Sequence, residues 1–338
     1  SSHGRVHHMS KKRWILPAAL WFMSIRPIDA FLLQHSRACR GPSAATWKAV
    51  CVDPPPKGTI WQVFPEGTPD IAPSTASGVI GMWSAHSAVF DLRLGSGKHV
   101  QAELVNNVPG ALLLHDVLSK EECLQAIVLS EAMGYQEHDL MKNTHAAVTW
   151  VADLENVVQP LFLRCQPFLP AILESLGGGA ARQLRGLNAR LRCYRYQPDG
   201  HQTFRLHRDD SFPMSSLDRH HGDRLVWDVS RGAESSVLTF LLYLSDEFDG
   251  GHTSFVPRHK EEALHVVDGI CIAEDDTELI TVKPRAGSVL VFYQTCSLDG
   301  DSESHPLAPL HEGSRVFHTR GKHTSPKYVI RSDVMYSC

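Results

Sequence analysis

The sequence lacks the short motifs that assign many proteins to a class at once. None of its eight cysteines stands in a CxxC pair or in the Cys/His spacing of a zinc site. Their wide scatter over 338 residues defines no disulfide framework either. Gly95-Ser-Gly-Lys98 is similar to the end of a phosphate-binding loop, but Leu92 stands where that loop needs its first glycine. We therefore expect neither a zinc finger nor a P-loop nucleotide site.

An excess of positive charge is also missing from the chain as a whole. The formal net charge is -4, which argues against a general nucleic-acid binder. Residues 1–60 differ, because they hold nine Lys or Arg and only two Asp or Glu, a net charge of +7. This asymmetry predicts a basic targeting or tail segment ahead of a mildly acidic domain.

The chain has little that could cross a membrane. The apolar run Trp14–Ile25 would rise only about 18 Å as a helix, too short for a hydrocarbon core of about 30 Å. Lys11-Lys12-Arg13 before this run and Ala30 after it are typical of a secretory signal in residues 1–30. The acid-free stretch that follows resembles a transit peptide. We expect no stable transmembrane anchor. We expect the segment to direct the protein to the secretory pathway or endoplasmic reticulum, or to a plastid. The alternative is a cytoplasmic protein with a basic tail.

Residues 31–105 carry no pattern of a folded domain. They are basic at first, and six prolines then fall between positions 53 and 78. Proline lacks a backbone donor and fixes its own φ, so this region is predicted to be linker-like.

A folded domain is predicted over residues 106–338. Ser119 and Glu122 form a capping box for a helix that Gly134 ends, and a second helical region is expected over 154–176, where three prolines could break it. From about 186 the pattern changes to short alternating or apolar runs separated by Gly/Pro turns. Helices followed by many short strands predict an α+β fold, a double-stranded β-helix (jelly roll) with its N-terminal helices packed on one side.

One stretch carries the ligands of a metal site. His207-Arg-Asp209 follows an aromatic-bearing strand, and residues i and i+2 of an extended strand share a face. With one distant histidine they would form a 2-His-1-carboxylate triad, which favours non-haem Fe(II) with open coordination positions. His221-Gly-Asp223 and His259-Lys-Glu261 have the same spacing, but both lie in charged runs with no apolar flank to hold them.

The third ligand should follow the buried strands. His305, His311, His318 and His323 are the candidates, and only His311 follows both apolar positions and a predicted strand. His318 and His323 fall in a basic, polar insertion and are expected to be loop histidines.

The last predicted strand offers a cation for an anionic ligand. Lys327, Val329, Arg331 and Asp333 share one face by period two. A Lys or Arg that points into an apolar barrel needs an anionic partner, and a bound dicarboxylate would supply it. The alternative is a pair of charges exposed at a strand edge.

The motifs YRYxPDG, HxDDSF, LTFLLYLSDEFDGGHTSFVP, VKPRAGSVLVF, LHEG and KYVIRSDVMY occur in this order. Over residues 108–337 this set resembles the prolyl 4-hydroxylase-like branch of the 2-oxoglutarate/Fe(II) dioxygenases. The resemblance implies that His207, Asp209 and His311 bind iron.

The resemblance also implies a cosubstrate site. It implies that Lys327 pairs with the distal carboxylate of 2-oxoglutarate, with Arg331 as second choice, and that Tyr196 hydrogen-bonds the cosubstrate. O2 would be the other cosubstrate and ascorbate a reductant. More residues separate His311 from Lys327 than is usual in the family, which indicates an insertion around residues 317–325.

The function expected from this resemblance is hydroxylation of a C–H bond, in a prolyl or another peptidyl residue, with release of succinate and CO2. Asp209, a carboxylate in place of Ala or Gly, argues against the halogenating variant of this chemistry. The alternatives are the same chemistry on a small metabolite, and a metal- or ligand-binding jelly roll without turnover. The sequence leaves the substrate and the oligomeric state open.

Overall fold

A computed structural model describes most of the chain from residue 99 onward and a few earlier strands. All described residues belong to one compact unit, Pro42–Cys338. They are residues 60–63, 65–66, 82–85, 92, 99–141, 144–152, 157–174, 180–198, 202–218, 224–267, 270–272, 278–295, 305–321 and 324–338. The segment predicted as a targeting signal, residues 1–30, lies outside them.

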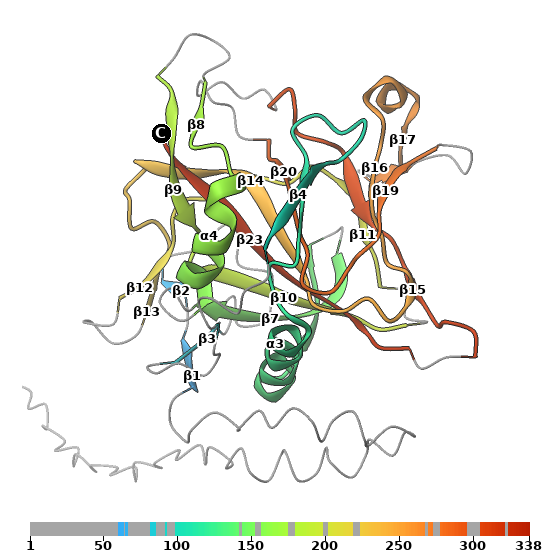
Figure 1. The fold of residues 1–338 in the computed structure, drawn as a ribbon, viewed down its shortest axis with the longest axis horizontal. Helices are drawn as coiled ribbons and strands as arrows, with labels where there is room; N and C mark the ends of the chain where they lie inside the picture. The colour runs from blue at the N-terminus through green and yellow to red at the C-terminus, as the bar shows by residue number, and fades with distance from the viewer. Residues whose placement is uncertain are drawn as a thin grey trace, which may run out of the picture. The chain divides into compact units, whose positions relative to one another are not determined.

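One continuous 18-stranded sheet forms the body of this unit, and it divides into a larger and a smaller antiparallel sheet that join where Phe204 pairs with Thr144 (Figure 1). The larger runs in the order β4–β5–β20–β14–β23–β10–β7–β6 and every one of these neighbouring pairs is antiparallel. Its strands are β4 (Gln101–Leu104), β5 (Leu112–His115), β20 (Val289–Tyr293), β14 (Glu234–Tyr243), β23 (Lys327–Ser337), β10 (Arg190–Tyr196), β7 (Thr144–Ala152) and β6 (Gln136–Met141).

The smaller sheet runs in the order β19–β16–β21–β11–β18–β17, again antiparallel throughout. Its strands are β19 (Ile280–Val282), β16 (Thr253–Phe255), β21 (His311–Gly313), β11 (Phe204–His207), β18 (Ile270–Ile272) and β17 (His265–Val267). The remaining strands are β1 (Ile60–Val63), β2 (Pro65–Glu66), β3 (Met82–Ala85), β8 (Ile172–Leu173), β9 (Arg182–Leu187), β12 (Ser216–Asp218), β13 (Arg224–Val226), β15 (Asp249–Gly250) and β22 (Val316–Phe317). Two facing antiparallel sheets with few helices are the predicted jelly roll, which is confirmed.

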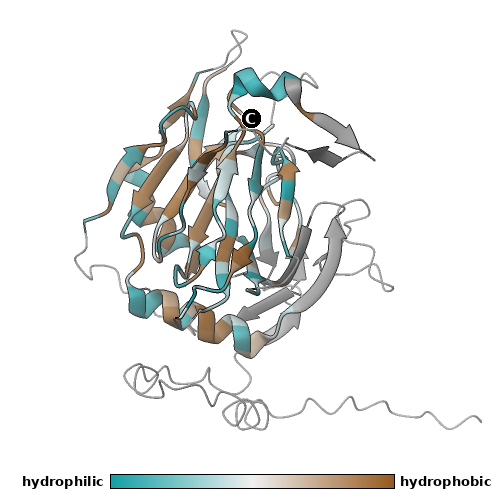
Figure 2. Cartoon of the chain, turned by 90° about the vertical axis from the view of Figure 1, so that its right-hand side faces the viewer, coloured by the Kyte–Doolittle hydropathy of each residue, from teal (hydrophilic) through white to brown (hydrophobic). Residues whose placement is uncertain are grey.

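Alternation along the strands separates two hydrophobic clusters. On β23, Tyr328 and Ile330 face a cluster shared with the helices, whereas Val329 between them faces a second cluster with Tyr243, Phe255 and others between the sheets. Figure 2 shows the long apolar segments of the strands that this double burial requires. Because strand residues alternate between faces, the inward positions of β23 and β10 are free to carry the site.

Two α-helices cover the outer face of the larger sheet. The helix α3 (Lys120–Met133) begins with the predicted capping box of Ser119 and Glu122 and ends at Gly134. The second, α4 (Gln159–Cys165), is much shorter than the predicted 154–176, and a 3₁₀ turn η2 (Gln166–Phe168) and strand β8 follow it. The predicted range 154–176 was too long for one helix, whereas the expected break at the prolines is confirmed, since Pro167 stands in the 3₁₀ turn that follows Cys165. Another 3₁₀ segment, η3 (Arg258–Ala263), follows β16.

Part of the region predicted as linker-like pairs with the sheets. The edge strand β4 pairs with β5 along its whole length. Further upstream, β1 pairs with β3, β3 meets β7 at Trp83 and Val151, and β2 pairs with β13. A linker would not form such strand pairs, so these residues differ from the linker that the sequence predicts. The domain boundaries 1–30, 31–105 and 106–338 stay predictions. Within the described part of the chain, no helix has the length and apolar content needed to cross a membrane.

Candidate metal centre

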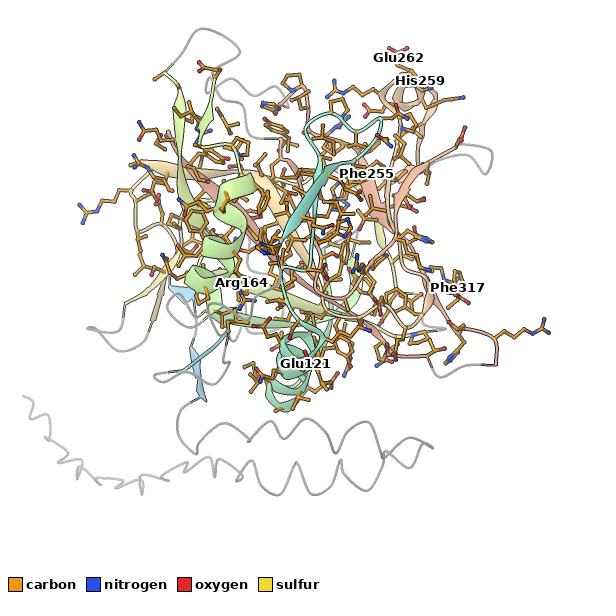
Figure 3. All side chains as sticks on the ribbon, viewed as in Figure 1. Glu121, Arg164, Phe255, His259, Glu262 and Phe317 are labelled. Carbon is orange, nitrogen blue, oxygen red and sulfur yellow. The ribbon has the colours of Figure 1, made fainter. Side chains whose placement is uncertain are left out.

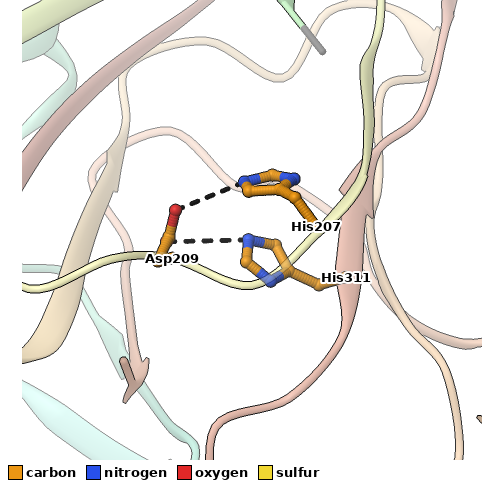
Figure 4. A group of neighbouring side chains, drawn as sticks. All are labelled: His207, Asp209 and His311. Atoms are coloured by element: carbon orange, nitrogen blue, oxygen red, sulfur yellow. Dashed lines mark ion pairs between the residues drawn. The ribbon is translucent and has the colours of Figure 1, made fainter. Parts of the chain in front are cut away.

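Three potential ligands meet where the smaller sheet faces the barrel interior (Figure 4). His207 is the last residue of β11, His311 is the first of β21, and the two are register partners in adjacent antiparallel strands. Asp209 follows β11 by two residues, as the shared-face argument requires. One ligand atom from each residue lies within 4.8 Å of the others, so the structure brings together the three predicted ligands.

Hydrogen bonds to the backbone orient both imidazoles. Nδ1 of His207 lies 2.6 Å from the carbonyl oxygen of Arg205, and Nδ1 of His311 lies 3.2 Å from that of Pro309. A carbonyl oxygen only accepts, so each Nδ1 carries the proton and each Nε2 presents a lone pair. Both Nε2 atoms face the carboxylate of Asp209, at 3.2 Å for His207 and 3.6 Å for His311. This convergence of two imidazoles and a carboxylate fits a metal ion held between them.

Aromatic side chains lock the two rings in place. Phe204 stacks on His207 with a centroid distance of 3.9 Å. Phe292 and Phe255 flank His311 at 4.6 Å and 5.8 Å. Burial, with a contribution from His207, lowers the pKa of His311 to about 3. His311 is therefore neutral and available as a ligand at physiological pH.

The carboxylate of Asp209 is buried yet charged. Burial alone would raise its pKa, but Arg331 and the two histidines lower the pKa well below the ordinary value. Oδ2 accepts a hydrogen bond of 2.7 Å from the hydroxyl of Thr239. Oδ1 accepts no hydrogen bond from the described residues, although Arg331 Nη1 lies 2.7 Å away. Two imidazoles with one charged carboxylate are a donor set that fits Fe(II).

A pocket opens beside the triad and encloses ≈ 440 Å³, including the part open to solvent. Tyr196, Lys327 and Arg331 of the larger sheet line it together with the three ligands. Its other lining residues are Tyr194, Phe204, Thr239, Leu241, Thr253, Phe292, Glu312, Gly313 and Val329.

Lys327 is the buried cation of this pocket. It begins β23 opposite Tyr196 of β10, and its Nζ lies 5.2 Å from the centre of the Tyr196 ring. Burial lowers the pKa of its ammonium to about 7, and none of the described carboxylates pairs with it. A buried ammonium without an anion is costly, so the pocket is suited to an acidic ligand.

Arg331, the second candidate for that role, has a different partner. Its guanidinium contacts Asp209 at 2.7 Å and lies 3.9 Å from Asp333. Burial alone would lower its pKa, but these two carboxylates raise it. The charge of Arg331 is therefore paired with the carboxylate of Asp209. Of the two candidate cations, Lys327 is the one whose charge no described carboxylate balances.

The competing histidines lie apart from the triad. His259 is exposed on η3, near Glu262 at the periphery (Figure 3). His305 stacks on Tyr293 at 4.4 Å, and His318 is exposed. His221 and His323 fall outside the described residues.

Three residues of the site were not singled out from the sequence. Thr239 bonds Asp209, Gln294 bonds Thr239, and Thr253 lines the pocket with its hydroxyl 2.7 Å from that of Tyr243. Polar residues at inward positions of apolar strands are the available signal for Thr239 and Thr253. Gln294 follows the end of β20 and carried no signal of its own.

Comparison with known proteins agrees with this geometry. Residues 191–331 match the family described as the 2OG-Fe(II) oxygenase superfamily, and this span contains all three ligands and Lys327. The fold and the His-Asp-His triad define an enzyme that uses Fe(II) and 2-oxoglutarate. The part of the chain that carries the metal centre is thus similar to the 2OG-Fe(II) oxygenase superfamily, and the resemblance is to its prolyl 4-hydroxylase-like members.

The individual relatives are distant. Prolyl 4-hydroxylase 1 of Arabidopsis thaliana is 27% identical over 241 residues, which cover 70% of this chain and 74% of the relative. Among solved structures, the viral collagen prolyl hydroxylase vCPH from Paramecium Bursaria Chlorella virus-1, in its 2OG complex, has a TM-score of 0.39 at 16% identity, covering 72% of this chain and 98% of its own. A prolyl-4-hydroxylase from Pseudomonas putida has a TM-score of 0.34 at 13% identity, covering 70% and 92%.

Proposed function

We propose that the protein hydroxylates a C–H bond of a peptidyl residue, with proline as the first candidate. The reaction would consume 2-oxoglutarate and O2 and give the alcohol, succinate and CO2. The observation that supports a peptidyl substrate is the relationship to a prolyl 4-hydroxylase over most of this chain. The chemistry itself is supported by the triad and its adjoining pocket.

We propose Lys327 as the anchor of the distal carboxylate of 2-oxoglutarate. The ammonium is buried, lacks a carboxylate among the described residues and lines the pocket that the triad adjoins. Tyr196 would hydrogen-bond the cosubstrate, since its hydroxyl stays protonated because burial raises its pKa. Thr253, on a strand next to His311, would add a second hydroxyl.

Each protein group then has a defined task. When bound, Fe(II) supplies the centre at which O2 is activated while 2-oxoglutarate loses CO2. His207, Asp209 and His311 would hold the ion. Lys327 neutralises the cosubstrate and orients it, and the aromatic lining excludes water from the reacting atoms.

A peptide assay tests the substrate class. The Fe(II) protein, supplied with 2-oxoglutarate, ascorbate and O2, is incubated with proline-rich peptides and with the same peptides carrying Ala for Pro. We expect a mass gain of one oxygen atom in the proline peptides, with matching succinate.

The variant Asp209→Asn is the control, since it lacks the carboxylate ligand and shows how much peptide oxidation and succinate form without the intact metal site. Succinate formed without any peptide oxidation, and oxidation of a small metabolite in its place, would contradict the peptidyl proposal while leaving the oxygenase chemistry intact. Ascorbate, likewise a proposal, is tested by omitting it, which should shorten the period of turnover.

A further inference from the structure

The metal-binding carboxylate is part of a ring of polar side chains, joined by hydrogen bonds on one side and by ion pairs of Arg331 on the other. Asp209 Oδ2 accepts from Thr239 at 2.7 Å, and Thr239 Oγ1 accepts from Gln294 Nε2 at 3.2 Å. Gln294 Nε2 also donates to Asp333 Oδ1 at 2.8 Å. Arg331 closes the ring, with Nη2 3.9 Å from Asp333 and Nη1 2.7 Å from Asp209. All five side chains are at least nine-tenths buried.

The direction of every hydrogen bond from Gln294 to the two carboxylates is determined. Carboxylates only accept, so Asp209 and Asp333 are the acceptors, and Arg331 joins the ring through ion pairs. The two hydrogens of the Gln294 amide are used on Thr239 and Asp333, which forces the Thr239 hydroxyl to donate to Asp209. Reversing the amide would set its oxygen against the carboxylate of Asp333.

A further bond fixes that amide. Ser236 Oγ donates to Gln294 Oε1 at 2.5 Å while it accepts from the backbone N–H of Phe212 at 2.8 Å. Phe212 lies three residues beyond Asp209, so the ring is connected to the same backbone segment that carries the ligand. The arrangement has one orientation only.

Rigid strands hold the members of the ring. Thr239 of β14 and Asp333 of β23 are register partners, and Arg331 lies two residues before Asp333 on the same face. The backbone N–H of Gln294 donates to Val237 of β14 at 2.8 Å. Asp333 also lies 3.2 Å from Arg192 of β10, which balances its charge without drawing on the ring.

We infer that this ring is a positioning device: Thr239 and Gln294 hold the Asp209 carboxylate in one orientation toward the two histidine Nε2 atoms. In that orientation Oδ1 lies 3.2 Å from Nε2 of His207 and Oδ2 lies 3.6 Å from Nε2 of His311, while Thr239 donates to Oδ2. Neither Thr239 nor Gln294 is a metal ligand; they act through Asp209. The inference rests on the iron site and is independent of the peptidyl substrate.

The test measures metal affinity in place of turnover. Co(II) is titrated anaerobically into the full chain, and its visible absorption gives both the dissociation constant and the ligand environment. Thr239→Val removes the hydroxyl at nearly constant volume, and Gln294→Leu removes the amide that orients it. We expect each variant to bind Co(II) about 10- to 100-fold more weakly, as partners of metal ligands typically do.

The double variant separates a ring from two independent contacts. Because Gln294 acts through Thr239, Thr239→Val/Gln294→Leu should bind Co(II) no more than about threefold worse than Thr239→Val alone. Thr239→Ser should restore both affinity and spectrum. Ser332→Ala is the matched control, since it removes a buried hydroxyl of β23 that bonds Asn188 on the opposite face.

Three results would overturn the inference. One is wild-type Co(II) affinity and spectrum in a folded Thr239→Val protein. Another is a double variant whose loss equals the product of the single losses. The last is an equal loss in Ser332→Ala, which would indicate general loosening of the barrel. If Thr239→Val does not fold, Gln294→Leu with wild-type affinity overturns the inference alone.

Discussion

At the scale of single residues, the three ligands differ sharply from the other histidines in what surrounds them. His311 is buried among aromatic rings and is neutral, whereas His259 on η3 is exposed and contacts no ligand. His305 is also buried and stacked, but among the described residues the triad is the group of His and carboxylate side chains whose ligand atoms converge on one point.

Removal of any one triad ligand should abolish Fe(II) binding and turnover. The variants are His207→Ala, Asp209→Ala and His311→Ala. Each leaves two ligands, which are too few to hold the ion against electrostatic repulsion by the nearby guanidinium of Arg331. His259 stands two residues before a carboxylate, as His207 does, but it lies outside the triad. The His259→Ala variant should therefore bind Fe(II) and turn over 2-oxoglutarate normally. Anaerobic metal titration and succinate release measure both, and a silent His207→Ala beside an inactive His259→Ala would refute the assignment.

Lys327→Ala should raise the KM for 2-oxoglutarate strongly, because it removes a charge pair in a buried site. Such a loss is about 2–5 kcal/mol, or roughly 30-fold and upward. Fe(II) affinity should change little, since Lys327 contacts none of the three ligands. A KM close to the wild-type value would place the anchor elsewhere.

The same lysine should make cosubstrate binding depend on pH. Burial lowers the pKa of Lys327 to about 7 in the free protein, and a bound dianion stabilises the ammonium and raises that pKa again. Affinity is then fully present below pH 7 and falls by about tenfold per pH unit above it, as one proton must be taken up. Lys327→Arg keeps its charge, so its affinity should stay flat across this range. Equal slopes in both proteins would contradict the assignment.

At the scale of elements, the sequence predicted what depends on local pattern. The capping box of α3 and the shared face of Lys327, Arg331 and Asp333 follow from spacings of three and two residues, and both were correct. The length of α4 was not, because proline placement and tertiary packing outweigh helical periodicity there.

The insertion between His311 and Lys327 shows what spacing alone leaves open. The structure forms β22 in this segment, and β22 pairs with β15 just before Gly251. Ser245 then bonds both Pro326 and the N–H of Tyr328, which fixes the start of β23. The extra residues are accommodated beside the sheet, so Lys327 keeps its inward position. No sequence rule distinguishes this outcome from a displaced strand.

The turn before β20 should be sensitive to a single methyl group. Gly287 has φ +83°, and a Cβ there would lie 2.2 Å from the carbonyl oxygen of Leu118, next to the start of α3. Gly287→Ala should therefore destabilise the protein by more than the backbone strain of about 1–2 kcal/mol.

Gly232 is the matched control for this turn. It has the same φ of +83°, but nothing lies within 4 Å of its Cβ position, so Gly232→Ala should show the strain alone. Denaturant unfolding measures both free energies. Equal losses of unfolding free energy in the two variants would mean that the backbone at Leu118 moves away from the added methyl group at little cost.

At the scale of the whole molecule, the strands before residue 106 matter for the boundary of the domain. β4 covers the edge of β5 through four register pairs, from Gln101 with His115 to Leu104 with Leu112. A chain that begins at residue 106 would expose that edge, and an exposed edge strand favours aggregation.

Two truncated proteins test this. A 99–338 fragment, which keeps β4, should be soluble and bind Fe(II), whereas a 106–338 fragment should be less stable and more prone to aggregate. Equal thermal stability of the two would make β4 dispensable. If both fragments are insoluble, the strands β1 to β3 are required as well.

Anaerobic addition of 2-oxoglutarate to the Fe(II) protein tests the central claim most directly. Chelation of the metal by the keto acid gives a weak visible charge-transfer band, which needs the triad to hold iron and the pocket to hold the cosubstrate. We predict a saturable band in the wild type, its absence in His311→Ala, and saturation only at much higher 2-oxoglutarate concentration in Lys327→Ala. A folded wild-type protein that binds Fe(II) but shows no band at any 2-oxoglutarate concentration would contradict this account.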